Sequence, residues 1–323
     1  MLEGAIDAHA HFVPDAYRDA LAAAGIDRPD GFPRVPDWSI EGALAQMDAL
    51  GIAAAVLSIS SPGIHFGDAA AARALARSVN EAGAAAVASS ATRFGFLASL
   101  PLPDVDGALA EVAYAFDELG ADGVVLMTNV EGRYPGDADY AELLAEVHRR
   151  EAVVVLHPAS PPGWEKTALG RPRPMIEFPF DTTRAVVDLA LAGSFTRFPD
   201  LRLVVPHTGS ALPVLVDRVA GFTKAIAPGD DAPVDIVAQL ADLHYDLAGD
   251  ATPRAIEALL ALTSPDRLLY GSDTPFPPPP VVEMLGRKLL DADALADPAQ
   301  RRAILRDNAL ALFPRLGEAP RPS

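Results

Sequence analysis

Cysteine is absent from the 323-residue sequence, and lysine occurs only at Lys166, Lys224 and Lys288. Without cysteine the chain forms no disulfide and offers no thiolate, so any metal must be held by histidine, aspartate or glutamate. No apolar run reaches the length that crosses a bilayer, so we expect no transmembrane helix. The first residues lack the basic and apolar segments of a signal peptide, and we therefore expect a cytoplasmic protein.

Basic charge is scarce as well. Lysine and arginine together number 26 against 44 aspartates and glutamates, which gives a formal net charge of −18. Such a surface repels phosphate backbones and anionic lipid, so we expect neither nucleic-acid nor membrane binding. Half of the residues are hydrophobic, which is enough for a large core in one domain spanning residues 1–323.

Short β-rich apolar runs alternate along the chain with segments of helical composition. We predict strands at residues 5–8, 53–59, 94–100, 123–127, 152–156, 201–205, 243–247 and 267–270. We predict helices at residues 40–50, 68–86, 104–119, 138–150, 182–192, 211–225, 253–262 and 281–290, and a C-terminal helix at 298–312. Eight strands alternating with helices favour an α/β fold, a closed (β/α)8 TIM barrel.

Two long loops interrupt the alternation, at residues 12–37 after the first strand and 158–181 after the fifth. The second loop is rich in proline, which argues against a long helix or a central strand there. Long loops at the carboxyl ends of barrel strands often carry substrate specificity. An open doubly wound sheet is the alternative fold, but it needs a glycine-rich phosphate loop after its first strand, and AHAHF at 8–12 is not one.

Several polar side chains occur where strands are predicted to end. They are His9 and His11 after the first strand, His157 after the fifth, His207 after the sixth and Asp273 after the eighth. His9 and His11 are two residues apart, so on an extended strand both imidazoles face one side. Barrel closure would bring all five together at the mouth, where three imidazoles and one carboxylate suit a catalytic Zn²⁺ or a similar divalent ion.

Taken singly, each of these histidines is more simply explained as a hydrogen-bonded structural residue, and only their combination indicates a metal site. Three further histidines are assigned differently. His65 follows the second strand, where it either contacts substrate or orders its loop. His148 is expected on the solvent face of a helix, and His244 lies early in a strand, where a structural role is expected.

Four segments, IDAHAH at 6–11, HP at 157–158, HTGS at 207–210 and GSDTPF at 271–276, resemble the amidohydrolase superfamily over nearly the whole chain. The sequence is more similar to the branch containing 2-amino-3-carboxymuconate-6-semialdehyde decarboxylase, γ-resorcylate decarboxylase and 6-methylsalicylate decarboxylase. SSPGIHFGD, ASLPLPDVDGAL and RPRPMIEFPFDTTRAV most resemble the 6-methylsalicylate decarboxylase-like members. The resemblance implies a metal-dependent decarboxylase of an aromatic or unsaturated carboxylic acid that forms a homodimer or homotetramer.

By position, the resemblance implies metal ligation by His9, His11, His157 and Asp273, with His207 beside the metal-bound water as an acid/base or substrate-binding residue. Two features depart from the relatives. HTGS stands where they often carry HGGG or HAGG. The predicted first helix, IEGALAQMDALG, lacks the arginine with which the muconate-semialdehyde enzyme holds its substrate, so that substrate is not expected.

The loop at 158–181 supplies the candidate substrate contacts. Arg171 and Arg173 either bind an anionic substrate or are ordinary exposed arginines. Trp164 and Phe178, together with Phe180, either line an aromatic pocket or pack beneath the loop.

Lysine scarcity bears on the number of metal ions. Dinuclear amidohydrolases commonly bridge two metals with a carboxylated lysine at the end of strand four, and here GVVLMTN contains none, so we expect one divalent ion, zinc first and manganese second. For a decarboxylase we expect Asp273 to supply the proton that replaces CO₂, with His207 assisting. The same ligands would serve a hydrolase of a small amide or lactone that uses metal-bound hydroxide. A non-catalytic barrel with a structural metal is the third hypothesis.

Overall fold

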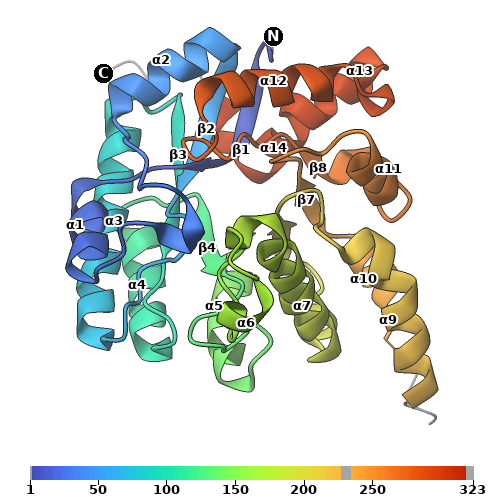
Figure 1. The fold of residues 1–323 in the computed structure, drawn as a ribbon, viewed down its shortest axis with the longest axis horizontal. Helices are drawn as coiled ribbons and strands as arrows, with labels where there is room; N and C mark the ends of the chain where they lie inside the picture. The colour runs from blue at the N-terminus through green and yellow to red at the C-terminus, as the bar shows by residue number, and fades with distance from the viewer. Residues whose placement is uncertain (1, 227–233, 318–323) are drawn as a thin grey trace.

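Eight parallel strands in chain order form the centre of the computed structural model, which describes residues 2–226 and 234–317 (Figure 1). The strands are β1 (Ala5–His11), β2 (Ile52–Ser58), β3 (Phe94–Ser99), β4 (Gly123–Met127), β5 (Val153–His157), β6 (Arg202–Val205), β7 (His244–Asp246) and β8 (Leu268–Leu269). Each strand pairs in parallel with the next along the chain. The order is that of a (β/α)8 barrel, as the alternation of strands and helices predicted.

The sheet is closed by the segment that follows β8, which lies against β1. Four backbone hydrogen bonds join them: Ala8 N to Tyr270 O at 2.9 Å, Ser272 N and Asp273 N to His9 O at 3.2 and 2.8 Å, and His11 N to Thr274 O at 2.7 Å. Asp7 adds to this seam, because its buried carboxylate accepts hydrogen bonds from the backbone N–H groups of His9 and Ser272. The seam therefore fixes Asp273 beside the end of β1.

Helices surround the strands (Figure 1). They are α1 (Asp15–Ala23), α2 (Ile40–Leu50), α3 (Ala69–Ser89), α4 (Val105–Asp117), α5 (Ala141–Arg149), α6 (Trp164–Thr167), α7 (Glu177–Leu191), α8 (Ser194–Arg197), α9 (Leu212–Ile226), α10 (Ile236–Ala241), α11 (Arg254–Leu260), α12 (Pro279–Leu290), α13 (Pro298–Arg302) and α14 (Asn308–Leu312). Ser39, Asp68 and Asp104 cap α2, α3 and α4 by accepting from backbone N–H groups of the first turn. None of the helices in the described ranges is long and apolar enough to span a membrane.

Three predictions about helices and loops need correction. The long loop after β1 contains α1, whose Tyr17 and Leu21, one turn apart, are both buried. Helix α7 starts at Glu177 rather than at residue 182, because Pro179 lies in its first turn, where no backbone N–H is needed. The predicted C-terminal helix is present, but a π-helical turn, Ala303–Asp307, separates α13 from α14.

The barrel interior is packed with apolar side chains rather than open. Ile6, Val56, Val125 and Val204 belong to one buried cluster with Phe313, which follows α14. Leu312 of α14 also lies beside Arg202 and His244, which start β6 and β7. The C-terminal segment therefore covers the base of the barrel, opposite the strand ends that carry His9, His11 and His157.

Candidate metal centre and active site

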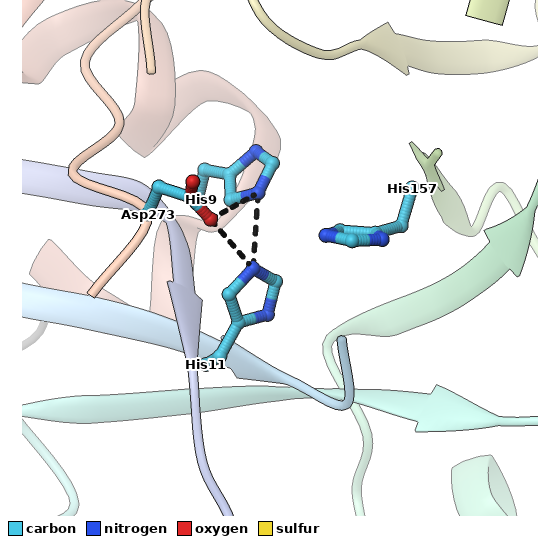
Figure 2. A group of neighbouring side chains, drawn as sticks. All are labelled: His9, His11, His157 and Asp273. Atoms are coloured by element: carbon cyan, nitrogen blue, oxygen red, sulfur yellow. Dashed lines mark hydrogen bonds and ion pairs between the residues drawn. The ribbon is translucent and has the colours of Figure 1, made fainter. Parts of the chain in front are cut away.

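Three histidines and one aspartate from strands far apart in the sequence point to a common centre at the mouth (Figure 2). One ligand atom each from His9, His11, His157 and Asp273 lies within 4.8 Å of every other. His9 Nε2 is 3.1 Å from His11 Nε2, and His11 Nε2 is 3.1 Å from Asp273 Oδ1. All three histidines are buried, whereas the Asp273 side chain is 21% exposed. The structure thus brings together the four predicted ligands.

Hydrogen bonds on the outer side of each imidazole show whether this set fits a cation. His9 Nδ1 donates to the Asp246 carboxylate at 2.7 Å, His11 Nδ1 to the backbone O of Ser58 at 3.2 Å, and His157 Nδ1 to the backbone O of Pro158 at 2.9 Å. With a proton on each Nδ1, each neutral ring directs a lone pair from Nε2 toward the centre. Lone pairs converging in a buried site repel one another unless a cation lies between them, so these residues fit a divalent metal.

Burial and neighbouring charges shift most of the pKa values so that the imidazoles stay neutral and the carboxylate stays ionised, as a metal site requires. One residue is an exception. Burial lowers the pKa of His11, and together with the charges of the adjacent imidazoles it holds the pKa of His157 well below its usual range. Burial opposes ionisation of Asp273, yet His11, His207 and His9 hold its pKa well below the usual value. His9 is the exception: burial disfavours its charge, but Asp246 raises its pKa to about 9. Metal binding would therefore displace a proton from His9 Nε2.

Asp246 is a member of the site that the motifs did not indicate. It ends β7, is fully buried, and binds His9 Nδ1 through Oδ2 while Oδ1 accepts from the backbone N–H groups of His207 and Ala248 at 3.0 Å. One carboxylate therefore orients a ligand and fixes the segment that carries His207. Its signal was present in the sequence, since it follows the same rule of a polar residue at a strand end.

His207 lies beside the centre but outside the ligand cluster. Its Nε2 is 3.8 Å from Asp273 Oδ2, the oxygen that does not face His11. Its ring centroid is 5.1 Å from that of His9. The imidazole therefore lies next to Asp273 without contributing an atom to the ligand cluster.

Two predicted substrate contacts lie near the mouth. Phe178 is buried in the first turn of α7, and its ring centroid is 6.5 Å from that of His157. His65 follows β2 and lies beside Ser99 and Met127 in a small cavity between the ends of β2, β3 and β4. It accepts from the N–H of Gly67, which fits the loop-ordering role, and its Nδ1 is 3.7 Å from Glu131.

The arginines of the same loop are placed differently. Arg171 is exposed, and its side chain makes no hydrogen bond to the described part of the chain. Arg173 donates to Ser160 at 3.0 Å, and its guanidinium stacks 4.0 Å from the centroid of the Trp164 ring. Arg173 and Trp164 therefore contact one another rather than the metal cluster. Phe276 belongs to the motif GSDTPF, but the sequence indicated no role for it. It lies closer to the metal cluster than these residues do, with its ring centroid 5.5 Å from that of His11.

Comparison with known proteins shows which family this chain belongs to. An amidohydrolase family model matches residues 6–315. The chain belongs to the amidohydrolase family. The 6-methylsalicylic acid decarboxylase acuB of Aspergillus aculeatus is 36% identical over 325 residues, covering 97% of each chain.

Solved structures show the same amidohydrolase fold. The crystal structure of an amidohydrolase II has a TM-score of 0.90 and 33% identity, and the match covers 98% of this chain and 100% of that one. A dihydroxybenzoic acid decarboxylase from Polaromonas sp. JS666, with bound manganese and the inhibitor 2-nitroresorcinol, has a TM-score of 0.83 and 24% identity, with 98% of each chain covered. The second likeness supports the fold alone.

Within this amidohydrolase, three residues of the segment HTGS at 207–210 adopt backbone conformations that favour glycine although they are not glycine. His207, Thr208 and Ser210 have φ angles of 55°, 56° and 57°, and Asp273 has 61°. These are left-handed conformations that glycine adopts without strain, and a β-branched threonine adopts them only when its surroundings impose them. The N–H of Thr208 donates to the backbone O of Asp246 at 2.7 Å, which helps impose this conformation. Such backbone strain at the mouth is typical of functional sites.

Proposed function

We propose that the protein is a metal-dependent, non-oxidative decarboxylase of an aromatic hydroxy acid of the 6-methylsalicylate or resorcylate type. The main support is the converging set of three Nε2 atoms and one carboxylate, in a chain 36% identical over 97% of its length to a 6-methylsalicylic acid decarboxylase. A divalent cation held by His9, His11, His157 and Asp273 would act as a Lewis acid on the carboxylate and the adjacent oxygen of such a substrate.

The chain's own residues then handle the proton. Decarboxylation breaks the bond from the ring to CO₂ and leaves the electron pair on carbon, which must take up one proton. The depressed pKa of Asp273 means that its carboxylate is ionised at rest, so it must receive that proton before delivering it. His207 Nε2, 3.8 Å from Asp273 Oδ2, is the nearby group that can donate it. We therefore propose that His207 protonates Asp273, and that Asp273 protonates the ring carbon.

We propose one bound ion. Three imidazoles and one carboxylate favour zinc, while the manganese in the Polaromonas decarboxylase makes manganese the alternative. Met127, not a lysine, ends β4, in agreement with a mononuclear site. The homodimer or homotetramer and the cytoplasmic location remain predictions, which light scattering and cell fractionation test.

A panel of 2-hydroxybenzoates tests the function when CO₂ release is measured alongside metal content by mass spectrometry. We expect about one equivalent of metal per chain and CO₂ release in proportion to that metal. An apo sample prepared with a chelator is the matched control, and it should recover activity on addition of Zn²⁺ or Mn²⁺. Hydrolysis of a lactone or amide, with no CO₂ from any acid, would assign the same ligands to a hydrolase instead.

A further inference from the structure

The loops that follow β1 and β5 start on opposite sides of the barrel mouth, because these strands are four places apart in a ring of eight. The two loops nevertheless meet. Ser160 Oγ donates a hydrogen bond to Asp30 Oδ1, and Arg173 Nε donates to Ser160 Oγ at 3.0 Å. The guanidinium of Arg173 also lies 3.8 Å from the Asp30 carboxylate. We call Asp30, Ser160 and Arg173 the clasp.

The clasp is an enclosed contact rather than a surface ion pair. The Asp30 side chain is 4% exposed and that of Arg173 is 16% exposed, and the Arg173 guanidinium is stacked on Trp164. A charge-assisted hydrogen bond shielded from water contributes more to stability than an exposed ion pair does.

The backbone beside the clasp is adapted to this close approach. Asp30 has a φ angle of 52° and Gly31 has 85°, both in the left-handed region. A Cβ on Gly31 would lie 3.1 Å from Arg173 Nη1 and 3.2 Å from Pro172 Cα. Only glycine lets the two loops approach this closely without a shift of one of them.

The segment that the clasp holds leads directly to the metal cluster. Phe32 follows Gly31, and its ring centroid is 5.1 Å from that of Phe276, whose ring is in turn 5.5 Å from His11. Phe32 and Phe276 also line a cavity of about 340 Å³ whose lining includes none of the four clustered residues. The position of Phe32, and hence the shape of the aromatic surface beside the cluster, therefore depends on where the clasp places the β1 loop.

We propose that the clasp closes the barrel mouth across the metal centre and positions Phe32 beside Phe276, so that the site selects planar aromatic acids. Arg173 is then a positioning residue that acts through Asp30, and it does not hold the substrate carboxylate as one sequence hypothesis suggested. The effect on substrate selection rests on the proposed decarboxylase function, whereas the tether between the loops does not.

Hydrogen–deuterium exchange tests the tether without any assay of activity. In Arg173→Gln we expect amides of residues 26–37, in the other loop, to exchange about tenfold faster, since an enclosed charge-assisted contact has been removed. Asp30→Asn should have the reciprocal effect on residues 158–176, because asparagine tolerates the left-handed conformation while losing the charge. Arg171→Gln, an exposed arginine of the same loop, is the matched control and should change neither segment. Acceleration confined to the loop that carries each substitution would overturn the proposal.

Kinetics separate positioning from substrate binding. We expect both Arg173→Gln and Asp30→Asn to raise KM for a 2-hydroxybenzoate about tenfold while kcat changes less than about threefold, and the double variant to be no worse than either one. If Arg173 bound the substrate carboxylate, Asp30→Asn would leave KM unchanged or lower it, which contradicts the clasp. Ser160→Ala is the replacement should either charged variant fail to fold. If the wild type turned over no acid, the proposed function would fail while the exchange experiment still decided on the tether.

Discussion

His9 is buried at one end of the barrel and His244 is partly buried at the other, and their pKa values are shifted in opposite directions. His9 at the mouth has its pKa raised to about 9, because the Asp246 carboxylate outweighs the effect of burial. His244 at the base has its pKa lowered to about 4, by burial and by the nearby guanidinium of Arg267. Loss of water is common to both, so the charge of the neighbouring side chain decides the sign.

Strand β7 links these two environments, because His244 starts it at the base of the barrel and Asp246 ends it at the mouth. At the base, Arg202 pairs with Glu151 at 3.1 Å and Arg267 with Asp242 at 3.8 Å, and both carboxylates are more than three-quarters exposed. At the mouth, the Asp246 carboxylate is fully buried and fully used in hydrogen bonds. The mouth is therefore arranged to hold charge in a fixed geometry, and the base to pair charges in solvent.

The largest effect should follow from removing a ligand at the mouth. In His9→Ala we expect bound metal to fall to background and CO₂ release to fall by at least about 10³-fold, since the cluster loses one of its three imidazoles. Metal analysis and the decarboxylation assay measure the two losses. His148→Ala, a histidine of helix α5 away from the cluster, serves as control. Full metal content in His9→Ala would show that the ion, if any, is held elsewhere.

A smaller loss is expected from the residue that orients His9. Asp246→Asn keeps an oxygen for the N–H groups of His207 and Ala248 but removes the charge facing His9 Nδ1, so metal affinity should fall by about 10–100-fold. Competition with a fluorescent chelator measures this affinity. Asp250→Asn, which affects an exposed carboxylate paired with Lys288 at 2.6 Å, is the matched control. Equal affinities in the two variants would contradict an orienting role for Asp246.

The strand-end positions of His9, His11, His157, His207 and Asp273 were predictable because each follows an apolar run. The choice of four of them as metal ligands came from the resemblance to amidohydrolases. Asp246 obeyed the same rule but was overlooked, since β7 has only three residues and His244 was the more conspicuous side chain. The left-handed angles at His207 and Asp273 were not predictable, because packing imposes them against local preference.

The contact of Arg173 with the other loop could not be predicted, for a different reason. The charge of Arg173 suggested a substrate contact, but its partner Asp30 lies in the loop after β1, and no local pattern relates the two loops. Helix α1 was missed in that same loop because it presents only Tyr17 and Leu21 to the core and has no side-chain cap. Strand order and strand-end residues follow from periodicity, whereas contacts between loops depend on barrel closure.

At the base, stability should depend on the protonation of His244. Its pKa is about 4 in the folded chain, against about 6.5 for an unperturbed histidine in the unfolded chain. Between these pH values the unfolded chain binds more protons, so stability is lost as pH falls. His244→Gln should remove this dependence, so from pH 7 to pH 4.5 the wild type should lose on the order of 2 kcal/mol more than the variant. Urea unfolding at the two pH values measures the difference. Parallel losses in both proteins would mean that His244 titrates normally.

The smallest effect should come from Arg267, which lies next to His244. Within the described residues it pairs only with the exposed carboxylates of Asp242 and Asp266, at 3.8 Å. Arg267→Gln should cost less than about 1 kcal/mol at pH 7, because such solvated pairs contribute little. It should also move the pKa of His244 back toward its usual value, since the guanidinium is one cause of the depression. Urea unfolding measures the first effect, and titration of the His244 imidazole by nuclear magnetic resonance the second. A loss above about 3 kcal/mol, the size expected for breaking a buried pair, would mean that charge at the base is held as tightly as at the mouth.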